Sequence, residues 1–270
     1  MLRPIVDRDQ ELNILKASLE SRGEPPASIL LVEDVSGQGK TKLLELYKTY
    51  CRNTQIPVAH VDLKNGSLNP LDILHAVRKE LQPLLLPRCT AALQSPYIVS
   101  PSLEISDNKS LFGPASYTME TSISISGLSS EERKQWWSNG ARALLDDLCE
   151  LAGSQQSRFV FLFDTFQDVA KTETEIWIID HILRMATPTR VNCIVIVLAG
   201  KQVPEPTAEW APYCKVLTLQ PLKLVDWLEY ATSVKSNLTR DQIEQCYERH
   251  WDKPLTMAQI IDTFVKRGAV

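Results

Sequence analysis

The chain has 270 residues, enough for one large α/β domain or for one domain with a small appendage. Hydrophobic residues make up 44% of it and charged residues 23%, so a sizeable core can form. The net charge of -4 disfavours a sequence-independent attraction to nucleic acid, and the apolar runs are too short to cross a membrane. The six cysteines are scattered, which favours free thiols over disulfides or zinc ligands. We therefore expect a soluble, cytoplasmic protein.

The first third of the chain alternates between helical and extended patterns. Leucines at helical spacing predict a helix over residues 8–21, and the apolar run 28-SILLVE-33 predicts a strand. A helix then begins within the sequence GKT and ends near Cys51. A second strand is expected over residues 57–63, and a helix with a proline near its first position over residues 69–81.

Residues 83–130 differ from their flanks because they are rich in proline and serine. Within them only 118-TMETSISIS-126 alternates as a strand does. Two interpretations remain open at this point: an insertion that forms a hairpin or a mobile loop, or a linker.

The second half of the chain continues the alternation of helices and strands. The near-continuous apolar runs 158-RFVFLFD-164 and 191-VNCIVIVLAG-200 are typical of strands buried on both faces of a parallel sheet. The other expected elements are a helix from Ser130 to about Gly153, a helix over 174–186, a short strand over 215–219, and helices over 223–235, 239–250 and 254–267.

These elements predict an α/β fold. We expect a doubly wound, mostly parallel five-stranded sheet flanked by helices, with a ligand at the carboxyl ends of the strands. A small C-terminal helical subdomain would follow the sheet. The expected boundaries are residues 1–222 for the sheet domain, with its Ser/Pro-rich insertion, and 223–270 for the helical subdomain.

The stretch 34-DVSGQGKT-41 has the glycines, lysine and threonine of a phosphate-binding loop, at the junction of an expected strand and helix. In such a loop, consecutive main-chain N–H groups surround phosphate oxygens, the lysine adds a positive charge, and the Ser/Thr hydroxyl ligates Mg²⁺. Asp34 stands where the pattern has its first glycine, and an acid there weakens triphosphate binding unless it is turned away or paired. The alternative is a glycine-containing turn before a helix that happens to begin with Lys-Thr. The candidate nucleotide-binding residues of the loop are Ser36, Gly37, Gln38, Gly39, Lys40, Thr41 and Lys42.

A second acid, Asp164, ends the apolar run 158–164 and would hold Mg²⁺ together with Thr41; the alternative is an aspartate that caps the next segment. Three residues later stands Gln167, whose neutral amide can orient a water molecule but cannot take its proton. The nearest carboxylate is Asp168, so the sequence leaves hydrolysis open. Lys201 follows another predicted strand, where it would reach the γ-phosphate or simply be solvated.

Taken in order, these segments resemble the signal-transduction P-loop ATPases called STAND, relatives of the NB-ARC and NACHT modules within the wider AAA-like class. The resemblance covers most of the chain, which is short for this family and has degenerate motifs. The matching segments are 5-IVDRDQEL-12 for the N-terminal element beside the adenine, 34-DVSGQGKTKLL-44 for Walker A, 160-VFLFDTFQ-167 for Walker B, 194-IVIVLAGK-201 for the sensor strand, 216-VLTLQPLKLVDWLEYA-231 for the strand and helix that follow it, and 250-HWDKPLTMAQII-261 for the helix of the G-x-PL element.

The departures from the family pattern fall at functional positions. Asp7 and Asp34 replace glycines, Gln167 replaces an acid, Lys201 replaces an arginine, and Asp252–Lys253 stand where the family has a glycine. These departures suggest a relaxed demand for hydrolysis, with nucleotide binding kept. The chain also ends before the winged-helix and repeat domains that usually follow, so we expect a fragment or an unusually short member.

The resemblance implies an adenine-nucleotide-binding regulatory switch with weak or absent hydrolysis. Its cofactor would be ATP or ADP with Mg²⁺, clamped between the sheet and the C-terminal helices, and a protein partner or a homo-oligomer would respond to it. Val6 and Arg8 would lie in the element beside the adenine, with Arg8 and Pro254 flanking the base. Two alternatives stand beside this hypothesis: an active Mg²⁺-dependent ATPase, and a nucleotide-free pseudo-ATPase scaffold for a protein partner.

Overall fold

The computed structural model describes residues 8–20, 27–66, 68–81, 86–94, 128–155, 158–184 and 192–265. Val6 and most of the Ser/Pro-rich segment, including the expected strand 118–126, lie outside these residues.

Five parallel strands form one sheet, in the order β2-β3-β4-β1-β5. Their bounds are β1 (Ile29–Glu33), β2 (Val58–Asp62), β3 (Phe159–Asp164), β4 (Ile194–Gly200) and β5 (Cys214–Leu217). The prediction of an α/β fold with a five-stranded parallel sheet is confirmed. Strand β4 lies between β1, which ends just before Asp34, and β3, which ends at Asp164.

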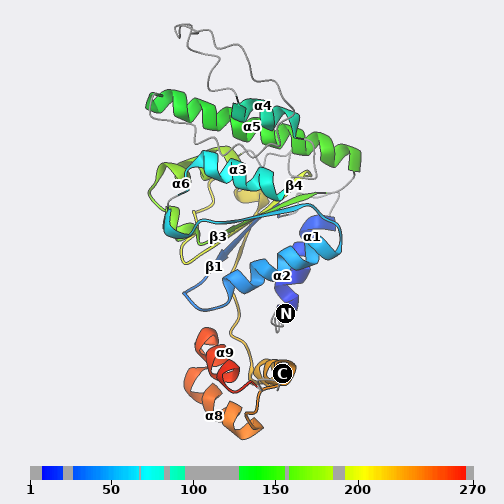
Figure 1. Cartoon of the computed structure of the whole chain (residues 1–270), viewed down its shortest axis with the longest axis vertical. Coiled ribbons are helices and arrows are strands. Elements are labelled where there is room, and N and C mark those ends of the chain that lie inside the picture. The colour runs from blue at the N-terminus through cyan, green and yellow to red at the C-terminus, as the bar shows by residue number, and fades with distance from the viewer. Residues whose placement is uncertain are drawn as a thin grey trace, which may run out of the picture.

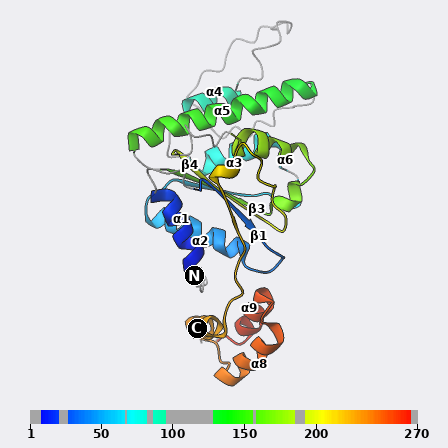
Figure 2. The ribbon, with the colours of Figure 1, turned by 180° about the vertical axis from the view of Figure 1, so that it is seen from behind.

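Helices cover both faces of the sheet, as Figures 1 and 2 show from opposite sides. On one face lie α1 (Asp9–Glu20) and α2 (Lys40–Asn53), and on the other α3 (Pro70–Glu80), α4 (Pro87–Gln94), α5 (Ser130–Gln155) and α6 (Glu173–Trp177). A π-helical segment (Ile178–Leu183) continues α6, and 3-10 turns occupy Lys64–Gly66, Phe166–Val169 and Ala211–Tyr213.

Each strand contributes side chains to both cores. In β3, Phe159 and Phe161 pack toward α3, α5 and the π-helical segment, whereas Val160 and Leu162 pack toward α1 and α2. This alternation explains the near-continuous apolar run of β3, because neither of its faces meets water.

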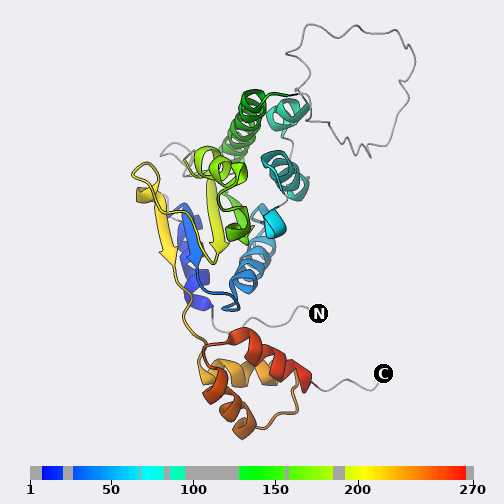
Figure 3. The same ribbon diagram turned by 90° about the vertical axis from the view of Figure 1, so that its left-hand side faces the viewer.

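Three helices follow the sheet: α7 (Leu224–Ser233), α8 (Arg240–His250) and α9 (Pro254–Thr263). They enclose a hydrophobic cluster of their own, in which Trp227, Tyr230, Met257 and Ile261 are buried. Figure 3 shows them beyond the arrowheads of the strands, next to the edge where the carboxyl ends of the strands meet.

Two elements differ from the sequence-based expectation. Residues 87–94, inside the Ser/Pro-rich segment, form the helix α4, whose Cys89 and Leu93 are buried with side chains of α5. The buried carboxylate of Asp147 on α5 accepts hydrogen bonds from the main-chain N–H groups of Arg88 (3.3 Å) and Cys89 (2.9 Å). The first turn of α4 is therefore capped by another helix, which no local pattern reveals.

The second difference concerns the helix expected over 174–186. It is α-helical only to Trp177 and then continues as the π-helical segment. Among the described residues, no helix combines the length and the apolar character needed to cross a lipid bilayer.

Candidate phosphate-binding site

The candidate phosphate-binding loop, residues 34–41 and called the phosphate loop below, joins β1 to α2. Asp34 N still donates to Gly200 O of β4 at 3.2 Å, and the chain then turns away from the sheet. Gly37 and Gly39 adopt positive φ angles of 86° and 94°, a conformation that residues with a Cβ atom adopt only under strain. Gly39 precedes α2, so the turn ends at a helix N-terminus, where free N–H groups and the helix dipole favour an anion.

Lys40, the first residue of α2, points its ammonium group back over the loop. Its Nζ donates to the main-chain oxygens of Asp34 (2.5 Å) and Val35 (2.7 Å). Partial burial lowers the pKa of Lys40, the charges of Asp34 and Asp164 oppose this shift, and the charge of Lys201 adds to it. The structure thus brings the lysine of the loop, the candidate metal-binding acid and the candidate sensor within electrostatic range of one another.

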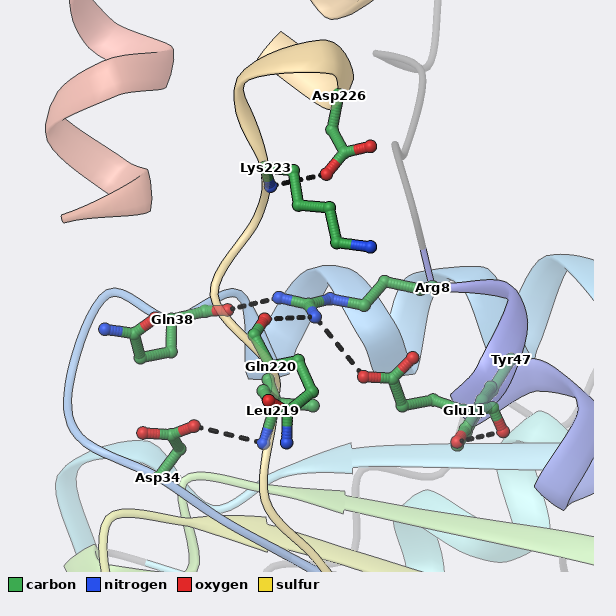
Figure 4. Close-up of polar contacts among 9 residues, drawn as sticks. All are labelled: Arg8, Glu11, Asp34, Gln38, Tyr47, Leu219, Gln220, Lys223 and Asp226. Atoms are coloured by element: carbon green, nitrogen blue, oxygen red, sulfur yellow. Dashed lines mark hydrogen bonds and ion pairs between the residues drawn. The ribbon is translucent and has the colours of Figure 1, made fainter. Parts of the chain in front are cut away.

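Asp34 is paired and does not project freely into the loop. Its Oδ1 accepts a hydrogen bond from Val35 N at 2.7 Å, and its Oδ2 accepts one from Leu219 N at 3.1 Å. Figure 4 shows the carboxylate directed toward the chain that leaves β5. The acid at the glycine position therefore has main-chain partners on two segments.

Asp164 ends β3 and is 4% exposed. Its Oδ1 accepts a hydrogen bond from Thr165 N at 2.8 Å, and Thr165 adopts a positive φ of 62°. In the register of the sheet, Asp164 is opposite Asp62, the last residue of β2, whose Oδ1 accepts a hydrogen bond from Thr165 Oγ1 at 3.0 Å. Two carboxylates thus lie at neighbouring strand ends, on the edge of the sheet where a ligand is expected.

Gln167 is fixed at both ends of its amide. Its Oε1 accepts a hydrogen bond from Lys201 N at 2.8 Å, and its Nε2 donates to Asp168 Oδ1 at 3.0 Å. These bonds connect the turn after β3 to the end of β4. A Cβ atom on Gly200 would lie 3.1 Å from Gln167 Oε1 and 2.6 Å from the main-chain oxygen of Gln202. The close approach of Gln167 to the end of β4 therefore requires a glycine at position 200.

Arg8 is buried, with 6% of its surface exposed. Its guanidinium group donates to Glu11 Oε1 (3.3 Å), Gln220 O (2.8 Å) and Gln38 O (3.1 Å), so it ties α1 to the phosphate loop (Figure 4). The side chain of Gln38 donates in turn to Asp252 O at 2.9 Å.

Four predicted residues of the candidate site remain. Pro254 is buried at the start of α9. The Cβ of its neighbour Leu255 lies 3.5 Å from the position that a Cβ atom on Gly37 would occupy. Ser36 and Thr41 are exposed on the loop. Lys42 lies just after the loop, on α2, and its Nζ pairs with Glu45 at 2.5 Å, so only its main chain is left for the candidate site.

Comparisons with known proteins give the fold. No known family model matches the chain, and no curated protein does. Among solved structures, a Walker-type ATPase of Pyrococcus abyssi is 16% identical, with a TM-score of 0.58 over 98% of this chain and 69% of that one. A signal transduction ATPase with numerous domains (STAND) and a tetratricopeptide repeat sensor, from Pyrococcus horikoshii, is 14% identical, with a TM-score of 0.49; the match covers 96% of this chain but 30% of that one. The fold is similar to that of the Walker-type ATPase of Pyrococcus abyssi.

Within this fold, sequence patterns did not reveal three contributors to the candidate site. Asp62 ends β2, a strand of mixed burial. The sequence signal that could have identified it is an acidic residue at the end of a second predicted strand. Leu219 and Gln220 contribute only main-chain atoms, for which side-chain identity gives no signal.

Proposed function

We propose that the chain is an adenine-nucleotide-binding regulatory switch of the STAND type, with weak or absent hydrolysis. One observation carries the proposal: the ammonium group of Lys40 lies on the main-chain oxygens of Asp34 and Val35, at a helix N-terminus preceded by two glycines with positive φ. Nucleotide phosphates can replace these oxygens as the partners of the lysine. The same helix N-terminus supplies the N–H groups that an anion needs.

Each predicted residue has a role in this scheme. Lys40 holds the phosphates together with the main chain from Ser36 to Lys42. Thr41 and Asp164 hold Mg²⁺, for which hydroxyl and carboxylate oxygens are suitable ligands. Lys201 senses the γ-phosphate. The base lies beside the segment with Val6 and Arg8, and Pro254 flanks it.

The weak hydrolysis in the proposal is supported by Gln167. Its amide is engaged on both sides, by Lys201 N and by Asp168, and it cannot accept a proton from water. A second candidate function, an active Mg²⁺-dependent ATPase, has one observation in its favour. Asp168 is an exposed carboxylate that accepts a hydrogen bond from Gln167. The same Gln167 side chain bonds to the main chain of the candidate sensor Lys201.

The proposal includes a division of the chain near residue 222. Helices α7–α9 enclose their own core, which supports a small C-terminal subdomain that follows the sheet domain. A nucleotide clamped between the two parts would favour one arrangement of them, and a protein partner or a second copy of the chain would bind that arrangement.

Equilibrium binding of labelled ATP tests the proposal. We expect Lys40→Ala to weaken ATP binding by about tenfold or more, because a charge-assisted contact with the phosphates is lost. The matched control is Lys79→Ala, which removes an exposed lysine from α3. Equal affinity of the wild type and Lys40→Ala would refute the proposal.

Calorimetric titration with ATP, ADP and GTP, with and without Mg²⁺, separates the remaining alternatives. The switch requires a preference for adenine and stronger binding with the metal. A nucleotide-free scaffold predicts no heat with any of the three. ATP at about 100 times its Kd should also stabilise the fold by about 2.7 kcal/mol if it binds the folded state alone.

A further inference from the structure

The first residue of the phosphate loop makes a bond that glycine cannot make. β1 and β5 pair in register as far as Val32 and Leu217. Asp34 and Leu219 each lie two residues beyond this last pair, and there Asp34 Oδ2 accepts a hydrogen bond from Leu219 N at 3.1 Å. The carboxylate therefore takes the place of a main-chain acceptor at the point where the two strands separate (Figure 4).

This bond attaches the loop to the chain that leads to the C-terminal helices. We call residues 218–223, which run from β5 to α7, the connecting segment. The other carboxylate oxygen of Asp34 accepts a hydrogen bond from Val35 N at 2.7 Å, within the loop itself. One side chain thus bonds simultaneously to the phosphate loop and to the connecting segment.

Arg8 makes a second link at the next residue of the connecting segment. Its guanidinium group donates to Gln220 O at 2.8 Å and to Gln38 O at 3.1 Å, so it bridges the connecting segment and the loop. Arg8 is buried, and the neighbouring carboxylate of Glu11 is buried with it. A buried guanidinium group that loses its acceptors is strongly unfavourable, so this bridge resists opening.

The loop also touches the C-terminal helices directly. Gln38 Nε2 donates to Asp252 O just before α9, and the Cβ of Leu255 lies near Gly37. Because α7–α9 enclose a separate hydrophobic cluster, they can move as a unit without opening it. Among the described residues, this hydrogen bond and this side-chain contact join the loop to the start of α9.

We propose that Asp34 and Arg8 form a latch between the phosphate loop and the connecting segment, and that the latch couples the occupancy of the loop to the position of α7–α9. In the free protein the latch is closed. Phosphates in the loop place negative charge near the Asp34 carboxylate, and repulsion between like charges weakens its hold on Leu219 N, more for ATP than for ADP. The nucleotide-dependent part of this inference rests on the proposed function, whereas the latch in the free protein does not.

Hydrogen exchange of the Leu219 amide, measured by NMR in the nucleotide-free full-length chain, tests the latch. Asp34→Gly removes the acceptor and should speed this exchange by about tenfold or more, the effect expected from losing a charge-assisted hydrogen bond. Asp34→Asn keeps an oxygen acceptor without the charge and should give a smaller increase. The control Glu229→Gln, at an exposed acid of α7, should leave the exchange unchanged.

Unchanged exchange at Leu219 in folded Asp34→Gly would overturn the latch. Circular dichroism establishes that the variant is folded. Should it be unfolded, Asp34→Asn decides the question, and exchange equal to that of the wild type would overturn the latch.

Addition of nucleotide tests the coupling. In the wild type, saturating ATP with Mg²⁺ should speed exchange at Leu219 more than saturating ADP, and Asp34→Gly should bind ATP more tightly than the wild type. Lys40-dependent ATP binding with unchanged exchange at Leu219 would overturn the coupling and leave the proposed function intact. Absence of Lys40-dependent binding would overturn both, and the latch in the free protein would still be judged by the first experiment.

Discussion

Lys40 carries its charge in surroundings that partly exclude water. Burial lowers its pKa below the ordinary lysine value of 10.5, although the carboxylates of Asp34 and Asp164 oppose the shift. A bound phosphate favours the protonated form of the lysine. The affinity for ATP should therefore be highest at pH values where Lys40 of the free protein is protonated. It should fall as the pH rises through the lowered pKa of Lys40.

Calorimetric titrations with ATP at increasing alkaline pH check this prediction. The wild type should lose affinity for ATP at a lower pH than it would if Lys40 had the ordinary lysine pKa of 10.5. The residual binding of Lys40→Ala should lack this decline. A decline of equal size in both proteins would assign the titration to another group.

The residues of the candidate site that the sequence could predict are those defined by local patterns. Gly39, Lys40 and Thr41 are recognisable because the turn, the charge and the helix start are adjacent in the chain. The pairing of Asp34 was not predictable, because its partner Leu219 N is 185 positions away and contributes only a main-chain atom. The bridge from Arg8 to Gln220 O is hidden from the sequence for the same reason.

At the scale of the element, the strands were the most predictable parts. β3 and β4 are buried along their whole length, and burial on both faces leaves an apolar run that is hard to mistake. The helix α4 was not predicted, because it is short and its N-terminus is capped by Asp147 from α5 instead of by a neighbouring residue.

This cap gives a stability prediction. Asp147→Ala should lower the free energy of unfolding by about 2 kcal/mol, because it leaves the N–H groups of Arg88 and Cys89 without their acceptor in a largely buried site. Urea denaturation measures the change. The control Glu131→Ala removes an acid from the exposed start of the same helix and should change the value by less than about 0.5 kcal/mol. Equal losses in the two variants would show that Asp147 does not hold α4.

At the scale of the whole molecule, the sequence predicted a five-stranded parallel sheet with its ligand at the carboxyl ends, but not the strand order. The order depends on which strands pair with one another after helical connections. Hydrophobic patterns predict each strand but do not indicate which strands lie next to it. The placement of β4 between β1 and β3, and the register that sets Asp62 opposite Asp164, therefore came from the structure alone.

The catalytic competence of the molecule gives the last prediction. With Gln167 engaged and unable to act as a base, ATP turnover should stay below about 1 s⁻¹, the lower end of typical enzyme rates. Release of inorganic phosphate with Mg²⁺ measures it, and Asp164→Ala serves as the blank. Faster release that Asp164→Ala abolishes would establish the active ATPase in place of the switch.

The carboxylate at position 34 also has an evolutionary consequence. Every aspartate codon becomes a glycine codon through one base change, so a loop with the usual glycine is a single mutational step away. On the proposed scheme, that mutation would strengthen the binding of polyphosphate and weaken the attachment of the last three helices to the loop. Natural selection acting on this position cannot improve both properties together, and the two would trade off through one side chain.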